Sequence, residues 1–317
     1  MEIGVQTKGI IEKGVDIQKG FALIGEAGFT KVDFNLDVFL TNSEIYGAKL
    51  NPFFDVEIEK LLPFFGSYKE AMKQAGITPS QMHAPYPVKV PGNVAVSDYM
   101  KSCVIPKSIV IAQELEVPWV VVHPFKSQYS LGKAAEWTEN IEYFKQLIPL
   151  LKERGVRLCL ENLYESIGGR LVEGVCANPL DAIGYIDTLN NEAGEELFGL
   201  CLDTGHLQIC HRDPYDYITR VGSRLKLLHL HENNGRDDLH EMPYTFGDSN
   251  TPGLDWEGVA QGLAEIAFDG TLSYETFPCM NAFPYTVRRE VLGVIYAAGE
   301  SLKIQIEAFR RETQEAI

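Results

Sequence analysis

The sequence lacks any long hydrophobic run. No stretch approaches the roughly 20 consecutive apolar residues that a membrane-spanning helix needs. The N-terminal segment MEIGVQTKGI has no basic region followed by an apolar one, so no signal peptide is evident. The chain also has no low-complexity tract and no domain linker. We therefore expect one cytoplasmic domain over residues 1–317 that makes no membrane contact.

Positive charge is scarce. Lys and Arg number 28 against 44 Asp and Glu, which gives a formal net charge of -16. Proteins that bind nucleic acid gain affinity by neutralising phosphates with Lys and Arg, so we expect no nucleic-acid partner. An acidic chain can still bind metal ions and small substrates.

Cysteine pairs with the spacing of zinc or redox motifs are absent. The six cysteines lie at positions 103, 159, 176, 201, 210 and 279, and none forms a CxxC pair. Cys159 and Cys201 fall inside apolar runs typical of strands. This pattern predicts reduced thiols in the core of a cytoplasmic protein rather than disulfides.

What the chain does contain is a regular alternation of short apolar runs with longer amphipathic segments. The eight runs cover residues 2–7, 31–36, 77–84, 119–124, 156–162, 198–206, 225–232 and 270–276. Eight strand–helix units in a chain of this length predict an α/β fold, the (β/α)8 TIM barrel. A doubly wound sheet is the alternative, but no Gly-rich fingerprint follows the first run.

The C-terminal segment 291–317 is predicted to be a helical tail. It can close the barrel or pair with a second subunit of a homo-oligomer, and closing the barrel is the favoured interpretation. The stretches 37–56, 125–133, 163–178 and 233–254 are predicted to be the loops that follow strands. In this fold such loops carry the functional face.

Reactive side chains gather where the predicted strands end. Taken alone, a histidine at one strand end is more often a satisfied polar residue than a ligand, and Glu161 or Glu275 alone could be a buried partner of arginine. Their convergence on one rim instead indicates a metal centre, because a buried carboxylate is costly unless something pairs it. The residues are His83, His123, Glu161, Asp203, His206, His229, His231, Asp238, His240 and Glu275.

The stretch LHLHENNGRDDLHE at 228–241 is the densest part of this set. Alternate residues of a strand share a face, so His229 and His231 point the same way. His229 is expected to lie deeper in the barrel mouth, with His231 nearer the rim. Asp238 and His240 are also two residues apart and can return to the mouth after the Asn-Asn-Gly turn.

Four motifs, LCLEN, LCLDTGH, HLHENNGRDDLH and FDGTLSYE, resemble the sugar phosphate isomerase/epimerase family of the xylose isomerase-like TIM barrel superfamily. The resemblance covers nearly the whole chain. It implies one divalent cation, Mn²⁺, Zn²⁺, Co²⁺ or Mg²⁺, held by Glu161, Asp203, His229 and Glu275. It also implies that Glu161 and Glu275 move a proton on the substrate and that His206 contacts it.

The same superfamily contains the endonuclease IV branch, which uses three zinc ions. The chain resembles that branch too, at His83 in HAPY, His123 in VVHP, and the Asp238 and His240 pair. These four residues, together with His231, are therefore candidates for additional metal or substrate contacts. The ligand set alone leaves both branches open.

Other features favour the sugar branch. The net charge of -16 is unsuited to duplex DNA. Aromatic residues in two of the loops suit sugars or another small organic ligand, or else serve loop packing. These residues are Phe39, Tyr46, Phe53, Phe54, Phe125 and Tyr129. The loop EMPYTFGDSNTPGLDW is longer than the Pro-Gly-x-Gly turn usual in the sugar branch, which leaves Arg236 as a weak candidate for substrate contact.

The sequence thus predicts a metal-dependent isomerase or epimerase of carbohydrate metabolism. Its substrate is expected to be a sugar or related small polyhydroxy carbonyl compound, processed through a metal-stabilised enediolate. A lyase that eliminates from an oxidised sugar is the second hypothesis, and a trinuclear zinc phosphodiester hydrolase is the third. The absence of a Gly-rich phosphate loop favours an unphosphorylated substrate.

Overall fold

The computed structural model describes residues 1–317 except 13, 128, 248–252 and 316–317. Eight parallel strands form one sheet in the order β10-β1-β2-β3-β4-β5-β8-β9. A bridge between Leu230 and Tyr274 joins the two outer strands, so the sheet closes into a barrel. The strands are β1 (Ile3–Gln6), β2 (Lys31–Asn35), β3 (Thr78–His83), β4 (Trp119–Val122), β5 (Arg157–Glu161), β8 (Phe198–Asp203), β9 (Leu225–His229) and β10 (Leu272–Tyr274).

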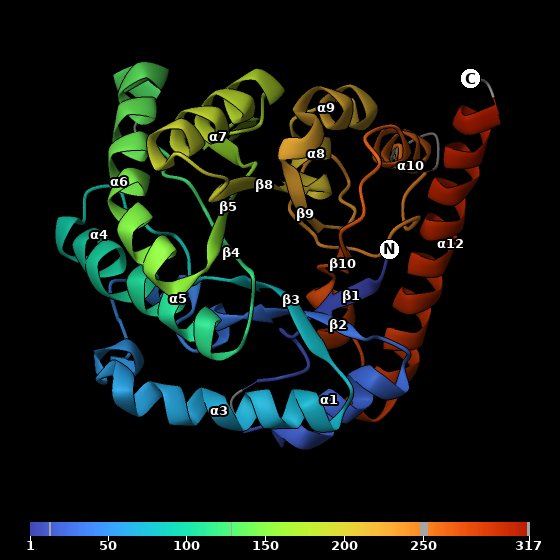
Figure 1. Cartoon of the computed structure of the whole chain (residues 1–317), viewed down its shortest axis with the longest axis horizontal. Coiled ribbons are helices and arrows are strands. Elements are labelled where there is room, and N and C mark those ends of the chain that lie inside the picture. The colour runs from blue at the N-terminus through green and yellow to red at the C-terminus, as the bar shows by residue number, and fades with distance from the viewer. Residues whose placement is uncertain (13, 128, 248–252, 316–317) are drawn as a thin grey trace.

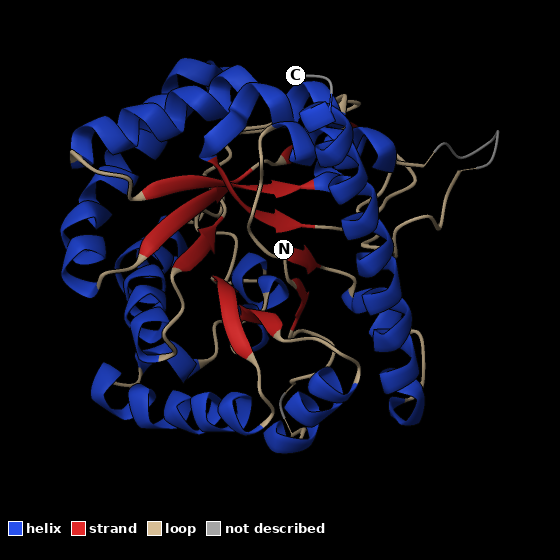
Figure 2. Cartoon of the chain, turned by 45° about the vertical axis from the view of Figure 1, so that its right-hand side comes forward, coloured by secondary structure: helices blue, strands red, loops and turns tan. Residues whose placement is uncertain are grey.

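Helices surround this barrel, and the strands lie inside the ring that they form (Figures 1 and 2). The α-helices are α1 (Ile17–Glu26), α2 (Asn42–Tyr46), α3 (Ile58–Gln74), α4 (Val94–Tyr99), α5 (Ile105–Glu114), α6 (Gly132–Arg154), α7 (Pro179–Ala193), α8 (Thr204–Ile209), α9 (Pro214–Val221), α10 (Trp256–Glu265), α11 (Phe277–Asn281) and α12 (Arg288–Glu315). The predicted TIM barrel and all eight predicted strand positions are confirmed.

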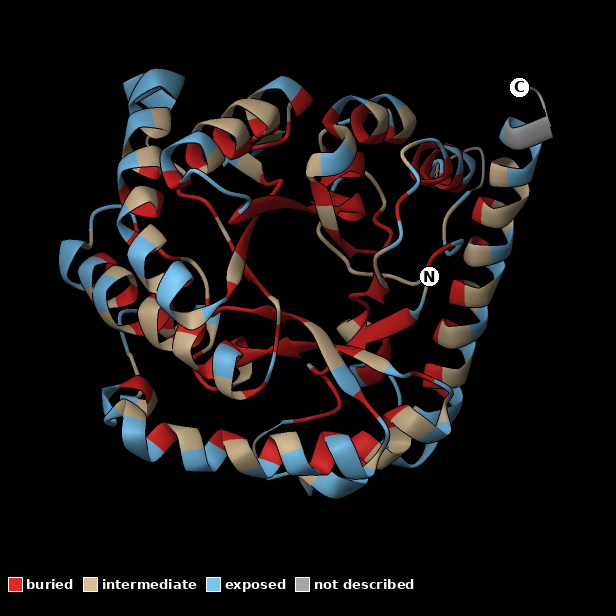
Figure 3. Ribbon diagram, in the orientation of Figure 1, coloured by how far each residue is buried: buried red, intermediate tan, exposed pale blue. Residues whose placement is uncertain are grey.

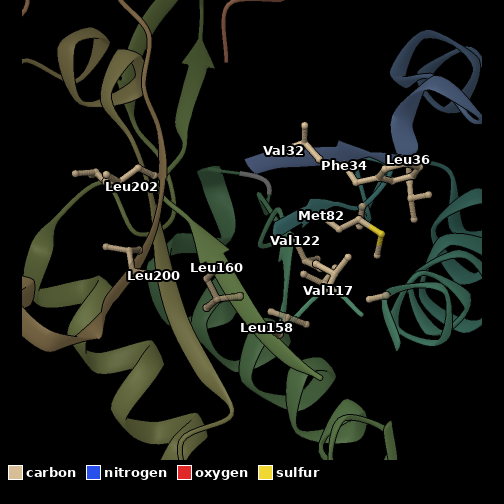
Figure 4. Close-up of a cluster of buried hydrophobic side chains, with 14 of the residues drawn as sticks. Val32, Phe34, Leu36, Met82, Val117, Val122, Leu158, Leu160, Leu200 and Leu202 are labelled. Carbon is tan, nitrogen blue, oxygen red and sulfur yellow. The ribbon is translucent and has the colours of Figure 1, made fainter. Parts of the chain in front are cut away.

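Alternation along the strands creates two separate apolar regions. Leu158 and Leu160 of β5, with Leu200 and Leu202 of β8, belong to the large core that includes the helices (Figure 4). Cys159 and Cys201, which lie between these leucines in the sequence, face the barrel interior. They form a second, small cluster with Trp119, Val121 and Leu227. Figure 3 shows the strands buried and the outward helix faces exposed. The interior face of each strand is therefore buried up to its C-terminal end, where the reactive residues begin.

The loops carry more structure than the sequence predicts. In the segment 163–178, β6 (Tyr164–Ile167) and β7 (Arg170–Glu173) pair as an antiparallel hairpin. The segment 37–56 contains α2, which begins with a capping box between Thr41 and Glu44. The predicted loop 233–254 includes 248–252, and those residues lie outside the described part of the chain.

The C-terminal helix α12 packs against the barrel. A Cβ atom at Gly299 would lie 2.7 Å from Ile3 Cγ2 of β1 and 3.0 Å from Tyr274 Cε2 of β10, so this glycine lets the helix approach both strands closely. Helix α12 thus covers the seam between β1 and β10, while residues 316–317 of the predicted tail lie outside the described residues. Among the described residues, no helix has the length and hydrophobicity needed to span a membrane.

Candidate metal centre

Four strand ends bring their last inward-facing residues together at the C-terminal mouth of the barrel. Glu161 Oε2 lies 3.3 Å from His229 Nδ1, and the same nitrogen lies 3.3 Å from Glu275 Oε2. Asp203 offers a ligand atom within 4.8 Å of those of His229 and Glu275. The side chains of this inner group, Glu161, Asp203, His229 and Glu275, are at most 8% exposed.

Two further histidines face the same carboxylate of the inner group. His83 Nε2 lies 3.4 Å from Glu161 Oε2, and His123 Nε2 lies 3.3 Å from it. His83 ends β3 and His123 directly follows β4, the two strands that precede β5 in the sheet. Glu161 Oε2 is buried and makes no hydrogen bond within the described structure.

An outer group consists of His206, Asp238 and His240, of which Asp238 and His240 are more exposed than the inner group. Asp238 Oδ2 is 3.5 Å from His206 Nε2 and 3.3 Å from His240 Nε2. The Asn233 side chain shapes the turn that returns Asp238 and His240 to the mouth. Its Oδ1 accepts hydrogen bonds from the backbone N–H groups of Leu239 and His240, at 2.6 Å and 3.1 Å. In the structure Asp238 and His240 therefore both lie at the barrel mouth.

In three histidines of the site, the neutral tautomer places an unprotonated ring nitrogen opposite a carboxylate. Nδ1 of His83, His206 and His240 each contacts a backbone carbonyl, of Ala84, Asn162 and Glu275, at 2.7 Å, 2.8 Å and 3.1 Å. Because a carbonyl only accepts, Nδ1 must donate, and in the neutral ring Nε2 then presents a lone pair. A lone pair facing a carboxylate oxygen needs a proton or a cation between them.

Asp33 of β2 likewise determines which ring nitrogen of His229 carries the proton. The sequence did not indicate this role for Asp33. Asp33 Oδ2 lies 2.9 Å from His229 Nε2 and also accepts a hydrogen bond from Gln81 Nε2 at 3.2 Å. An ionised carboxylate only accepts, so Nε2 carries the proton and the lone pair stays on Nδ1, which is buried and has no hydrogen-bond partner among the described residues. This carboxylate–histidine pair is the usual support of a metal ligand. The residues of the inner group therefore fit a divalent cation.

His231 supports the inner group rather than joining it. Its Nε2 lies 2.8 Å from Asp203 Oδ2, while the other oxygen of Asp203 accepts from the backbone N–H of His206 at 2.6 Å. A Cβ atom at Gly205 would lie 2.1 Å from His231 Cε1, so the glycine in the DTGH motif makes room for this ring. His231 is fully buried, and its ring stacks on that of His240 at 4.0 Å between centroids.

The concentrated negative charge shifts the pKa values of the site. Burial would raise the pKa of Glu161, but His123 and His229 hold it well below its usual range. Burial would lower the pKa of His206, but Asp203 and Asp238 raise it well above its usual range. At His123 burial prevails and lowers the pKa. The carboxylates of the site thus favour bound positive charge, either protons on histidine or a metal cation.

The groups surround a cavity of about 200 Å³. Its described lining includes His83, His123, Glu161, His206, Asp238, His240 and Glu275, together with Asn42, Tyr46, Tyr86, Lys126, Leu163 and Tyr164. Tyr86 stacks on His123 at 4.3 Å between ring centroids, and Tyr164 meets His206 edge-on at 5.1 Å. Sequence analysis missed both tyrosines and Lys126, although Tyr86 and Lys126 lie three residues beyond His83 and His123.

The aromatic loop residues divide between the two interpretations that the sequence left open, ligand contact and loop packing. Of these residues, only Tyr46 lines the cavity among the described residues. Phe39 and Phe53 pack among the aromatic rings of α3, and Phe54 is fully buried against Phe53. Phe125 packs on Tyr143 and Phe144, and Tyr129 is exposed. Arg236 is exposed and lines a separate surface pocket beside Arg212 and Asp255, because the turn at Asn234 and Gly235 directs it away from the metal centre.

The chain belongs to the xylose isomerase-like TIM barrel family, because the model of that family matches residues 21–290. The uncharacterized protein MJ1311 of Methanocaldococcus jannaschii is 26% identical over 203 residues, which cover 61% of this chain and 63% of the relative. This chain spans less than two thirds of the length of the curated relatives that it matches.

Solved structures share the fold over nearly the whole chain. L-ribulose 3-epimerase superimposes with a TM-score of 0.68 at 16% identity, covering 99% of this chain and 97% of that chain. D-psicose 3-epimerase, solved in the presence of D-fructose, superimposes with a TM-score of 0.66 at 13% identity, covering 95% and 99%. At these identities the likeness is one of fold.

Proposed function

We propose that the protein is a divalent-metal-dependent isomerase or epimerase that acts on a sugar or a related small polyhydroxy carbonyl compound. One observation carries the proposal: Glu161 and Glu275 both face His229 Nδ1 at 3.3 Å, at the edge of a cavity of about 200 Å³. Paired carboxylates suit proton transfer next to a carbonyl, and the small cavity suits a single sugar. The fold that the chain shares with L-ribulose 3-epimerase supports this choice.

In this proposal Glu161, Asp203, His229 and Glu275 hold the cation. When bound, the cation supplies Lewis-acid polarisation of the substrate carbonyl. Asp33 and His231 keep their partners His229 and Asp203 oriented.

The two glutamates carry the proton. One, ionised, removes a proton from the carbon next to the carbonyl. The other, protonated, returns a proton to the opposite face or to the neighbouring carbon. His206, whose pKa the carboxylates raise despite burial, donates a hydrogen bond to the oxygen on which negative charge develops. Tyr86, Tyr164 and the β6–β7 hairpin help to exclude water from the cavity.

Exchange of carbon-bound hydrogen with solvent deuterium tests this function. A panel of ketoses and aldoses is incubated with the metal-loaded protein in D₂O, and uptake is followed by NMR. At least one sugar should exchange, and Glu161→Gln and Glu275→Gln should both abolish the exchange while the protein stays folded. Retained exchange in both variants would contradict the roles of the two glutamates.

A trinuclear phosphodiester hydrolase is the second candidate. The observation that favours it is that four histidines outside the inner group present Nε2 to a carboxylate. His83 and His123 face Glu161 Oε2, and His206 and His240 face Asp238 Oδ2. Metal content of protein purified without added metal or chelator separates the two candidates. About one equivalent favours the sugar chemistry, whereas close to three equivalents of zinc, with phosphodiester hydrolysis, favours the hydrolase.

A further inference from the structure

Lys126 gives the cavity a positive charge that the metal centre does not use. It lies in the loop between β4 and α6, and it is the only lysine or arginine among the described residues that line the cavity. Its Nζ lies 4.8 Å from the centre of the Tyr164 ring, whose edge-on contact with His206 continues the same wall. Lys126 is thus positioned above the reacting groups, on the side of the β6–β7 hairpin.

The ammonium group has no carboxylate partner within ion-pairing distance among the described residues. Burial lowers the pKa of Lys126, and the carboxylates of Glu165, Asp238 and Glu161 act on it only from farther away, in the opposite direction. An ammonium group that is partly removed from water and unpaired is costly. Its position therefore calls for an anion that arrives from outside.

Other lysines of this protein show the contrast. Lys8, at the same mouth, pairs directly with Asp37 at 2.6 Å, and Lys133, on α6, pairs with Asp181 at 2.8 Å. If Lys126 served only to balance the charge of Glu161 and Asp238, a similar direct pair would be the stable arrangement. Instead its Nζ rests against an aromatic ring and remains available to a ligand.

We propose that Lys126 binds an anionic group of the substrate, which makes the substrate an acidic sugar rather than a neutral one. This inference rests on the proposed function and specifies its substrate class. A carboxylate is favoured over a phosphate, because the described lining of the cavity contains a single lysine and no arginine, whereas phosphate sites usually combine several donors. A cavity of about 200 Å³ suits a monosaccharide acid.

Binding of three probes with the same carbon skeleton tests the inference independently of turnover. Calorimetry on the Mn²⁺-loaded protein compares a hexitol, the corresponding hexonate and the hexitol phosphate. The wild type should bind the hexonate about 10- to 100-fold more tightly than the hexitol, the range expected for one charge-assisted hydrogen bond. Lys126→Met should remove this preference and leave hexitol binding unchanged, whereas Lys126→Arg should retain most of it.

Lys133→Met is the matched control, because it removes an exposed lysine that is already paired with Asp181. It should keep the full preference for the anion. Equal binding of hexitol and hexonate by the wild type would overturn the inference, and so would a preference that survives in Lys126→Met. If the phosphate binds more tightly than the hexonate and loses this advantage in Lys126→Met, Lys126 is still an anion site, with phosphate as its ligand.

The deuterium-exchange panel keeps this result separate from the proposed function. A Lys126-dependent anion preference without exchange on any sugar, once acidic sugars are added to the panel, would support the role of Lys126 and contradict the isomerase or epimerase. Exchange on neutral sugars, with no effect of Lys126→Met on any probe, would support the enzyme and overturn the acidic substrate.

Discussion

The inner and outer groups of the metal centre contain the same kinds of ligand but are built differently. Glu161 and Asp203 are the last residues of β5 and β8, and their side chains are at most 2% exposed. Asp238 and His240 lie in a loop, and their side chains are 23% and 12% exposed. Strand pairing positions Glu161 and Asp203, whereas turn hydrogen bonds position Asp238 and His240. The comparison teaches that the inner group is the rigid part, suited to holding a cation, and the outer group is the adjustable part, suited to substrate contact.

The largest effect is expected from Glu161→Gln in the inner group. The amide keeps the size of the side chain but removes the base and one negative ligand, so deuterium exchange should fall by about 10³-fold or more. The matched control is Glu142→Gln on the exposed side of α6, which should exchange at the wild-type rate. Circular dichroism should show both variants folded. A Glu161→Gln protein that retains exchange would remove Glu161 from the proposed chemistry.

Asp33→Asn tests how much the hydrogen bond from His229 to Asp33 contributes to metal affinity. The substitution weakens the acceptor that holds the proton on His229 Nε2, so Nδ1 becomes a poorer ligand. Metal affinity, measured by competition with a chelating dye, should fall by about 10- to 100-fold. Asp37→Asn is the control, since Asp37 is equally buried in the barrel mouth but pairs with Lys8. Unchanged affinity in Asp33→Asn would mean that the strands alone orient His229.

Asp238→Asn separates the two groups directly. If the outer group contacts substrate, exchange should fall by about tenfold while about one equivalent of metal stays bound. The neighbouring Asp237→Asn is a close control, because Asp237 is exposed and accepts a hydrogen bond from Asn234 Nδ2 instead. Both variants are measured for exchange and for metal content. Loss of a metal equivalent in Asp238→Asn alone would favour the trinuclear hydrolase.

The same difference in construction explains what could be predicted from the sequence. The eight strands follow from apolar runs, and the period of two along each strand directs Glu161, Asp203 and His229 to one face. Those residues, together with Glu275, come together at the predicted end of the barrel. The sequence could not decide between ligand contact and loop packing for the aromatic loop residues, because nothing in a loop sequence distinguishes Phe54, which is fully buried, from Tyr46, which lines the cavity.

Other parts depend on contacts between distant segments. Asp33 lies 196 positions before His229, and nothing local marks it as the partner of that ring. Lys126 follows an apolar strand as an ordinary loop lysine, and only the fold places it against Tyr164. Arg236 shares the predicted loop 233–254 with His240, but the intervening turn sends the two side chains to different pockets.

The smallest effect is expected from Asn233→Ala, which loosens the outer group without removing a ligand. The change deletes the acceptor of the Leu239 and His240 N–H groups, each bond contributing about 1 kcal/mol. Hydrogen exchange at those two amides should therefore accelerate by roughly tenfold or more, while metal affinity stays unchanged because the inner group does not depend on this turn. Asn234→Ala is the matched control: its side chain accepts from the N–H groups of Arg236 and Asp237, so protection should fall there and not at His240. If Asn233→Ala weakened metal binding as strongly as Asp33→Asn, the two groups would form one cooperative unit, and the distinction between a rigid inner group and an adjustable outer group would be wrong.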